Sequence, residues 1–190
     1  MSEPTAGRAL VVSGPSAVGK STLVRRLLTS PERRLSVSAT TRAPRPGEVE
    51  GIHYRFVDRP GFQRLVDQNA LLEWAEVYGN RYGTPRDEVD PFVGRGFTVL
   101  LDIDAQGFRS VRRSRPGTPG IFIAPPSLAI LEKRLRERAT EGPDAIRRRL
   151  EEAEREMAAM PEYDHVVVND DLERTARDLE ALLERLRAGR

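Results

Sequence analysis

The feature that most constrains this chain is the stretch LVVSGPSAVGKSTLVRRLL, residues 10–28. An apolar run comes first, a loop with glycine at both ends follows, and an amphipathic basic segment comes last. The loop from Gly14 to Ser21 satisfies G-x-x-x-x-G-K-[ST] between an expected strand and an expected helix. Its glycines let successive N–H groups face one anion, and the helix N-terminus adds its positive dipole end. The stretch therefore predicts a phosphate-binding loop, and a strand-to-helix turn without a ligand fits this complete match poorly.

In a loop of this kind Lys20 reaches the β- and γ-phosphates of a nucleoside triphosphate, and the Ser21 hydroxyl binds Mg²⁺. The residues expected to contact the triphosphate are Gly14, Pro15, Ser16, Ala17, Val18, Gly19, Lys20, Ser21 and Thr22. ATPases, GTPases and kinases share such a loop. The loop therefore predicts that a nucleotide is bound, but it leaves the acceptor of the phosphoryl group open.

The rest of the chain predicts an α/β fold. Four apolar, β-branched runs indicate strands, at residues 9–13, 98–104, 120–124 and 165–169. Helical patterns follow the first and the last two runs, at residues 20–29, 127–138 and 172–187. Continuous apolar strands separated by helices are typical of a parallel sheet that is buried on both faces. Between the first two runs, the segments 36–57 and 71–89 are rich in Gly, Pro, Arg and aromatic residues, which predicts an insertion of short strands and turns.

Composition excludes several classes of protein. No apolar run approaches the roughly 20 residues that a membrane span needs, and the N-terminus lacks the pattern of a secretory signal. The chain has no cysteine, which excludes disulfides and a thiolate nucleophile, and its two histidines are too few for a histidine-based metal site. We expect a cytoplasmic protein without a membrane or nucleic-acid partner. Nearly all of its 31 basic residues are arginine, a side chain that binds phosphate bidentately.

A second phosphate site is indicated inside the insertion. Arg42 and Arg45 stand three residues apart on a proline-stiffened loop, and Tyr54 and Tyr82 offer phenol donors. Each of these residues alone is better explained as a solvated charge or a half-buried tyrosine than as a ligand contact. Together with the phosphate-binding loop, they favour a second phosphorylated ligand.

Two carboxylates, Asp102 and Asp104, come at the end of an apolar strand and share one face. Open parallel sheets bind ligands at the carboxyl ends of their strands. The alternative is that the two residues only cap the turn between strand and loop.

Several segments occur in the order and spacing typical of one family. They are SGPSAVGKSTL, SVSATTRAPRPGEVEGIHYRFV, LLEWAEVYGNRYGTP, LLDIDAQG, FIAPPS and VVVNDDL. From about Arg8 to the C-terminal helix, the sequence resembles guanylate kinase, a P-loop nucleoside monophosphate kinase, and the TTRxPRxGE segment is far more specific than the loop. The resemblance implies a P-loop NTPase fold over residues 1–190, a single domain with a parallel sheet flanked by helices. It also implies a core at about 8–37, 93–137 and 151–190, a small mixed α/β GMP-binding insertion at about 38–92 and a mobile lid at about 138–150.

The resemblance also implies roles for individual residues. The GMP phosphate would be bound by Arg42, Arg45, Tyr54 and Tyr82, and the guanine base by Ser38, Glu73, Thr84 and Asp104. Lys20, Arg42, Arg138 and Arg149 would be catalytic, Ser21 and Asp102 would support Mg²⁺, and Asn169 would lie near the ATP adenine. For Glu73, spacing alone leaves open a charged residue on a helix surface. The sequence departs from the family pattern at Ala139 and at Gly142-Pro143, which bears on the hinge of the lid.

The function implied is Mg²⁺-dependent transfer of the ATP γ-phosphoryl group to GMP or dGMP, giving ADP and GDP in purine nucleotide metabolism. Two alternatives remain. A non-catalytic guanylate-kinase-like binding module typically loses loop residues, whereas this chain keeps Lys20 and Ser21. A P-loop kinase for another phosphorylated acceptor would not need Glu73, Ser38 and the TTRxPR loop together. The sequence leaves the oligomeric state open.

Overall fold

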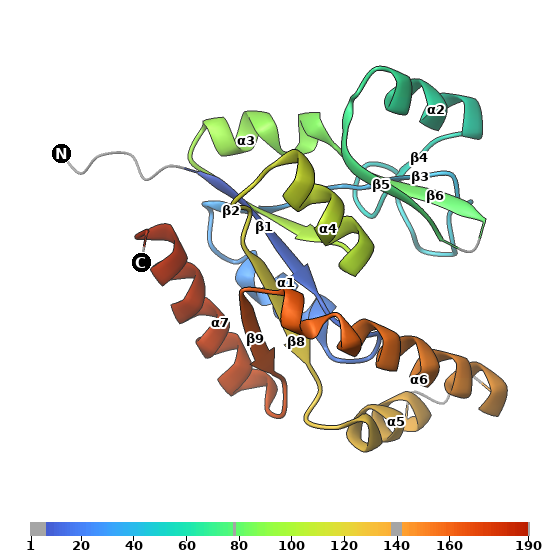
Figure 1. The fold of residues 1–190 in the computed structure, drawn as a ribbon, viewed down its shortest axis with the longest axis vertical. Coiled ribbons are helices and arrows are strands. Elements are labelled where there is room, and N and C mark those ends of the chain that lie inside the picture. The colour runs from blue at the N-terminus through green and yellow to red at the C-terminus, as the bar shows by residue number, and fades with distance from the viewer. Residues whose placement is uncertain (1–6, 78, 138–141, 190) are drawn as a thin grey trace. The chain divides into compact units, whose positions relative to one another are not determined.

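A computed structural model describes residues 7–77, 79–137 and 142–189 (Figure 1). The chain divides into two compact units. The first consists of the residues up to Leu10 and of Arg34–Thr118, and the second of Val11–Arg33 and the residues from Pro119 onward. Strand β1 (Arg8–Ser13) therefore begins in the first unit and ends in the second. Within the described ranges, no helix is both long enough and apolar enough to cross a membrane.

The second unit is built on a parallel sheet. The end of β1 pairs with β8 (Gly120–Ala124), which pairs with β9 (His165–Val168). All five residues of β8 are buried, as expected for an inner strand of a parallel sheet. The other elements of this unit are α1 (Lys20–Leu27), α5 (Leu128–Glu137), α6 (Pro143–Ala158), the 3₁₀ turn η2 (Met160–Glu162) and α7 (Leu172–Arg187).

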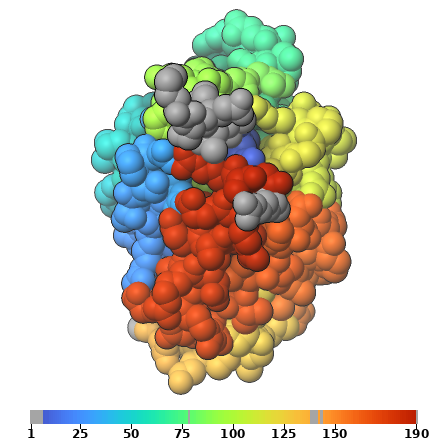
Figure 2. All heavy atoms as spheres, turned by 90° about the vertical axis from the view of Figure 1, so that its left-hand side faces the viewer, coloured from blue at the N-terminus to red at the C-terminus, as the bar shows by residue number. Residues whose placement is uncertain are grey.

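Helix α7 packs against α1 and β9 and exposes its other side (Figure 2). The Asp171 carboxylate caps the helix by accepting from the Arg174 N–H at 2.8 Å. Leucines 179, 182 and 183 are buried on the inner side. The guanidinium of Arg33 bonds to Glu180 and Glu184 on α7, at 2.5 and 2.8 Å. The helix is thus held by an apolar stripe and by ion pairs, among them the two that Arg33 makes.

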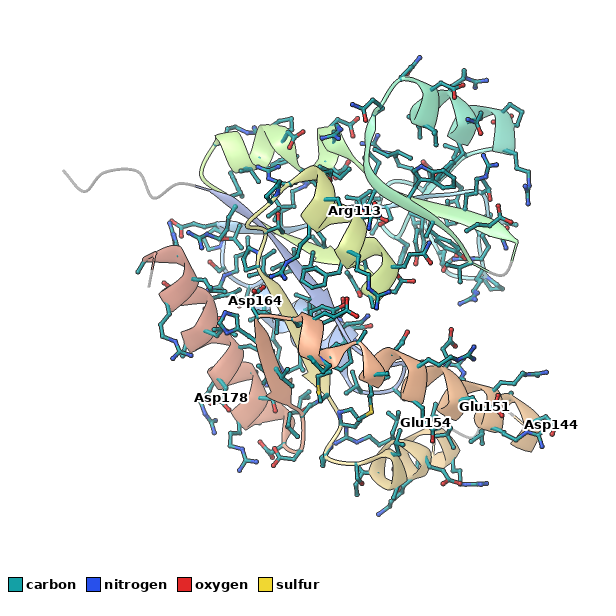
Figure 3. All side chains as sticks on the ribbon, viewed as in Figure 1. Arg113, Asp144, Glu151, Glu154, Asp164 and Asp178 are labelled. Atoms are coloured by element: carbon teal, nitrogen blue, oxygen red, sulfur yellow. The ribbon has the colours of Figure 1, made fainter. Side chains whose placement is uncertain are left out.

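Helices α5 and α6 share a small apolar core of their own. Leu131 and Leu135 of α5 pack with Ile146 and Ala153 of α6. Charged residues occupy the other side of α6, where the exposed carboxylates are those of Asp144, Glu151 and Glu154 (Figure 3). Most of the charge in this part of the chain is therefore a solvated helix face.

The first unit holds two groups of strands. In one, β7 (Thr98–Asp102) lies between β2 (Arg33–Leu35) and the start of β1. The other is a four-stranded sheet in the order β4-β3-β6-β5, formed by β3 (Ala39–Thr40), β4 (Arg55–Phe56), β5 (Leu71–Val77) and β6 (Asn80–Pro85). Its helices are α2 (Arg59–Asp67), the 3₁₀ turn η1 (Arg86–Glu88), α3 (Asp90–Gly94) and α4 (Ala105–Ser114).

The small sheet has its own core, in which Phe62 of α2 is fully buried with Ala39 and Leu71. Burial of a phenylalanine side chain stabilises a fold by about 1.5–3 kcal/mol. Strands β5 and β6 are antiparallel, with Glu73 directly opposite Thr84. This pairing fixes the position of the carboxylate on which the site depends.

The predicted fold class is confirmed: the chain is α/β, with a parallel sheet and flanking helices. The expected strands and helices all occur, and α1 ends at Leu27, two residues earlier than predicted. The short strands expected between the first two runs are present as β3 to β6. The predicted boundaries of core, insertion and lid stay a prediction.

Candidate active site

The phosphate-binding loop of the second unit requires glycine at both ends. Gly14 has φ 146°, and a Cβ there would lie 2.3 Å from the carbonyl oxygen of Ile123. Gly19 has φ 96°, and a Cβ there would lie 2.6 Å from Nδ2 of Asn169. Both backbone conformations are ones that glycine adopts without strain. Lys20 and Ser21 follow as the first two residues of α1, where N–H groups are available to an anion.

Two side chains from outside the loop hold its backbone. Asn169, at the end of β9, is 3% exposed, and its Nδ2 donates to the Val18 carbonyl at 2.7 Å. Arg134 of α5 donates to the carbonyl oxygens of Asn169 at 2.9 Å and Val18 at 3.4 Å. The Asn169 amide nitrogen is therefore already bonded to the loop. Arg134 was not predicted, because nothing in its helical pattern shows which way it points.

A cation also reaches the loop from α6. Arg149 donates from Nη1 to the hydroxyl oxygen of Ser16 at 2.6 Å. This contact places Arg149 at the loop, while its role at the triphosphate stays a prediction. Arg138 and Ala139, which belong to the expected lid, lie outside the described residues.

The first unit contains a cavity of about 190 Å³, roughly six times the volume of a water molecule in the liquid. Predicted site residues line much of it: Ser38, Tyr54, Glu73, Tyr82, Asp102 and Asp104. Ala75, Val77, Gly83 and Ile103 complete the lining and were not predicted. Ala75 and Val77 alternate with Glu73 along β5, so the period of two residues in a strand would have identified them once that strand was assigned.

Glu73 is the most unusual residue of this pocket. It lies on β5 and is 6% exposed, so the alternative of a charged residue on a helix surface is wrong. Its Oε1 accepts from the Thr84 hydroxyl at 2.7 Å. Burial raises the pKa of Glu73 to about 7, against the opposing effect of this hydrogen bond. Near neutral pH the pocket therefore holds a carboxyl group that is close to its pKa and populates both protonation states.

Arg42 lies beside the two tyrosines. Its guanidinium is 5.3 Å from the centre of the Tyr54 ring, and the rings of Tyr54 and Tyr82 are 6.1 Å apart. Burial raises the pKa of Tyr54, so its hydroxyl remains a donor at neutral pH. These three side chains come from two segments of the sequence, 36–57 and 71–89, and are brought together by β3, β4 and β6.

Glu48 is a residue of this cluster that was given no role in advance. Arg42 Nη2 donates to both carboxylate oxygens of Glu48, at 2.8 and 2.9 Å. The Arg45 backbone N–H also donates to Glu48, at 2.7 Å, while the Arg45 side chain is exposed. The hydrogen bond from Arg42 is the main cause that lowers the pKa of Glu48. The signal was present in the sequence, since Glu48 ends the TTRxPRxGE segment.

Asp104 both caps a helix and lines the pocket. Its Oδ1 accepts from the Gly107 N–H at 2.8 Å and caps α4, yet the same residue lines the pocket. Asp102 ends β7 and also lines the pocket. Thus the cap does not remove Asp104 from the site.

A glycine-ended loop at a helix N-terminus and a small pocket around a buried carboxylate define a P-loop nucleotide-binding protein of the α/β class. Residues 6–186 match the family model described as guanylate kinase. The chain belongs to the guanylate kinase family.

Similar proteins agree over nearly the whole chain. It is 55% identical over 174 residues to a guanylate kinase of Synechococcus sp. (strain CC9311), covering 91% of this chain and 92% of the other. It is 50% identical over 184 residues to a guanylate kinase of Rubrobacter xylanophilus, covering 96% of each. The crystal structure of guanylate kinase from Anaplasma phagocytophilum aligns with a TM-score of 0.79 at 37% identity, covering 96% of this chain and 87% of that one. These matches support the kinase and neither of the two alternatives.

Proposed function

We propose that this chain acts as a guanylate kinase by binding the guanine of GMP against Glu73 and transferring to GMP the γ-phosphoryl group of ATP. The observation that carries this assignment is the buried carboxylate itself, which lines a cavity of about 190 Å³ and is 6% exposed. A buried carboxylate is costly unless a partner compensates it. Guanine supplies such a partner.

The chemistry of the base matches the pocket. Guanine presents N1–H and N2–H₂ on one edge, and an ionised Glu73 accepts from both. Adenine presents an acceptor at N1 and leaves the carboxylate without that bond. Because the Thr84 hydroxyl already donates to Glu73, Ser38 is the hydroxyl that remains to donate to the guanine O6. We assign Asp104 to the edge of the base that carries N1–H and N2–H₂, next to Glu73.

The GMP phosphate is assigned to Arg42, Tyr54 and Tyr82, with Arg45 as the second cation. An arginine and two phenols supply the donors that phosphate oxygens accept. Glu48 orients Arg42 and partly neutralises its positive charge through their ion pair. We therefore assign Glu48 a positioning role.

The donor nucleotide is assigned to the loop of the second unit. The backbone of residues 14–22 surrounds the phosphates of ATP, and Lys20 neutralises their charge. Asn169 supports this site by holding the Val18 carbonyl, and Arg149 adds a cation next to Ser16. Arg138 is assigned a similar role by its position in the sequence.

Magnesium fits the residues present. Mg²⁺ keeps several waters and binds phosphates with one or two protein groups, so an exposed Ser21 hydroxyl at the start of α1 suffices as a ligand. Asp102 is a second candidate. When bound, the ion would neutralise charge on the transferred group.

The reaction needs no general base, because the acceptor oxygen of GMP is already anionic. The bond between the γ-phosphorus and the β,γ-bridging oxygen of ATP breaks, and a bond forms between that phosphorus and a phosphate oxygen of GMP. ADP leaves with the bridging oxygen, so atoms and charge balance. What the chain contributes is positioning and neutralisation of charge, through Lys20, Arg42 and Arg149.

The experiment is a coupled assay of ADP formation with GMP, dGMP, AMP and UMP as acceptors. We expect turnover with GMP and dGMP, and a kcat/KM for AMP lower by at least about a hundredfold, as expected when a buried polar group loses its partner. Glu73→Gln should lower kcat/KM for GMP and leave the KM for ATP nearly unchanged. Lys20→Ala should abolish transfer in a folded protein. Equal rates with GMP and AMP would contradict the assignment.

A further inference from the structure

Gly107 stands in the first turn of α4, next to the guanine pocket, where its backbone does not require glycine. It is not among the residues with positive φ. Alanine is a better helix former than glycine at such a position. A glycine that the backbone does not need indicates that space, rather than conformation, is the reason for it.

Two side chains border this space, those of Glu73 and Ile103, and only Glu73 belongs to the proposed base site. A Cβ at Gly107 would lie 3.2 Å from Oε2 of Glu73, closer than the 3.4–4 Å of ordinary van der Waals contact. The other carboxylate oxygen, Oε1, is already fixed by Thr84 at 2.7 Å. A side chain at residue 107 therefore has to turn or displace a carboxylate that is held at its other end.

We propose that Gly107 is a specificity-determining residue for the acceptor base. By lacking a side chain, it leaves Oε2 of Glu73 in the plane where the carboxylate accepts two N–H groups from one purine. This inference rests on the proposed guanine site and adds a residue to it. Gly107 acts through Glu73 and is therefore a positioning residue.

A competing explanation lies in the packing around Ile103. The same Cβ would lie 3.1 Å from Cβ and 3.2 Å from Cδ1 of Ile103. If that contact were the reason for the glycine, a substitution would disturb the strand-to-helix turn as a whole. All acceptors and the stability of the protein would then be affected alike.

The test is Gly107→Ala in the full chain, assayed with GMP and, at high concentration, with AMP. We expect the KM for GMP to rise about tenfold, since small misplacements of a positioning group are costly. The KM for ATP and the kcat/KM for AMP should stay within about twofold, so that the preference for GMP over AMP falls. Gly94→Ala is the matched control: Gly94 also lies in a helix of the first unit without positive φ, and a Cβ there meets nothing within 4 Å. It should change none of these values.

A double substitution separates this inference from the proposed function. In a Glu73→Gln background, Gly107→Ala should cost less GMP affinity than it does alone, because the glutamine amide has the same size but no longer accepts both N–H groups of the base, so its displacement matters less. If Glu73→Gln leaves the preference for GMP unchanged, the proposed guanine site itself is wrong. A second outcome is that Glu73→Gln abolishes the preference for GMP, but Gly107→Ala lowers GMP and AMP turnover equally or lowers neither. In that case the guanine site stands, and only the role of Gly107 is overturned. Loss of folding or of ATP-analogue binding in Gly107→Ala would also overturn it.

Discussion

At the scale of a single residue, the burial of Glu73 makes the stability of the protein without GMP depend on pH. Its pKa is raised from 4.5 to about 7, so the folded state holds this proton more tightly than the unfolded chain does. The free energy of unfolding therefore falls as pH rises from about 4.5 to about 7 and above. Between pH 5 and pH 8, we expect the free energy of unfolding of the wild-type protein without GMP to fall by about 2 kcal/mol because of this group. The Glu73→Gln variant should not show this decrease. Urea unfolding of both proteins at the two pH values measures the difference.

GMP should reverse the direction of this dependence. In the proposed site the base needs the ionised carboxylate, so the affinity for GMP should improve as pH rises toward 8. The improvement should be smaller in Glu73→Gln, where only the GMP phosphate, with a second pKa of about 6, still titrates. Identical pH slopes of stability in the two proteins would contradict an elevated pKa for Glu73. Sequence could identify the carboxylate as a candidate, but the pKa depends on neighbours that only folding supplies.

At the scale of an element, Ala17 of the phosphate-binding loop packs against the apolar cluster of α5 and α6, and an arginine of α5 also bonds to the loop backbone. Arg134 donates to the carbonyl oxygens of Val18 and Asn169. Hydrogen bonds from a charged group contribute about 1.5–3 kcal/mol each when buried, and less when partly exposed. We expect Arg134→Ala to raise the KM for ATP roughly tenfold or more and to leave the KM for GMP within about twofold.

The matched control on the same helix is Arg136→Ala. Arg136 is exposed and pairs with Glu132 one turn away, so its loss should change neither KM. An unchanged KM for ATP in Arg134→Ala would show that the loop keeps its shape without the hydrogen bonds from Arg134. The helix itself was predicted from its apolar spacing, whereas the target of Arg134 was not.

At the scale of the whole molecule, the two proposed nucleotide sites belong to different compact units. The loop and its supports lie in the second unit, and the pocket around Glu73 lies in the first. We expect GMP alone to slow amide hydrogen exchange in β5 and β6, and a non-hydrolysable ATP analogue alone to slow it in residues 14–22. Exchange measured by mass spectrometry with each ligand separately tests this. Protection of residues 14–22 by GMP and not by the analogue would refute the assignment of the two sites.

The sequence by itself determined the fold class, the phosphate-binding loop and the family. These depend on local patterns: glycines at fixed spacing, apolar runs of strand length and motifs that stay contiguous along the chain. The resemblance to the family implied that Glu73, Arg42, Tyr54 and Tyr82 are members of one acceptor site. That assignment needed no knowledge of how their side chains meet.

Only the tertiary structure decided how those residues act on one another. Thr84 bonds to Glu73 from the opposite strand, and Gly107 faces the same carboxylate from a helix later in the chain. Asn169 reaches Val18 across a separation of 151 residues. Such contacts are set by the packing of elements, and neither propensity nor periodicity encodes which side chains it will bring within hydrogen-bond distance.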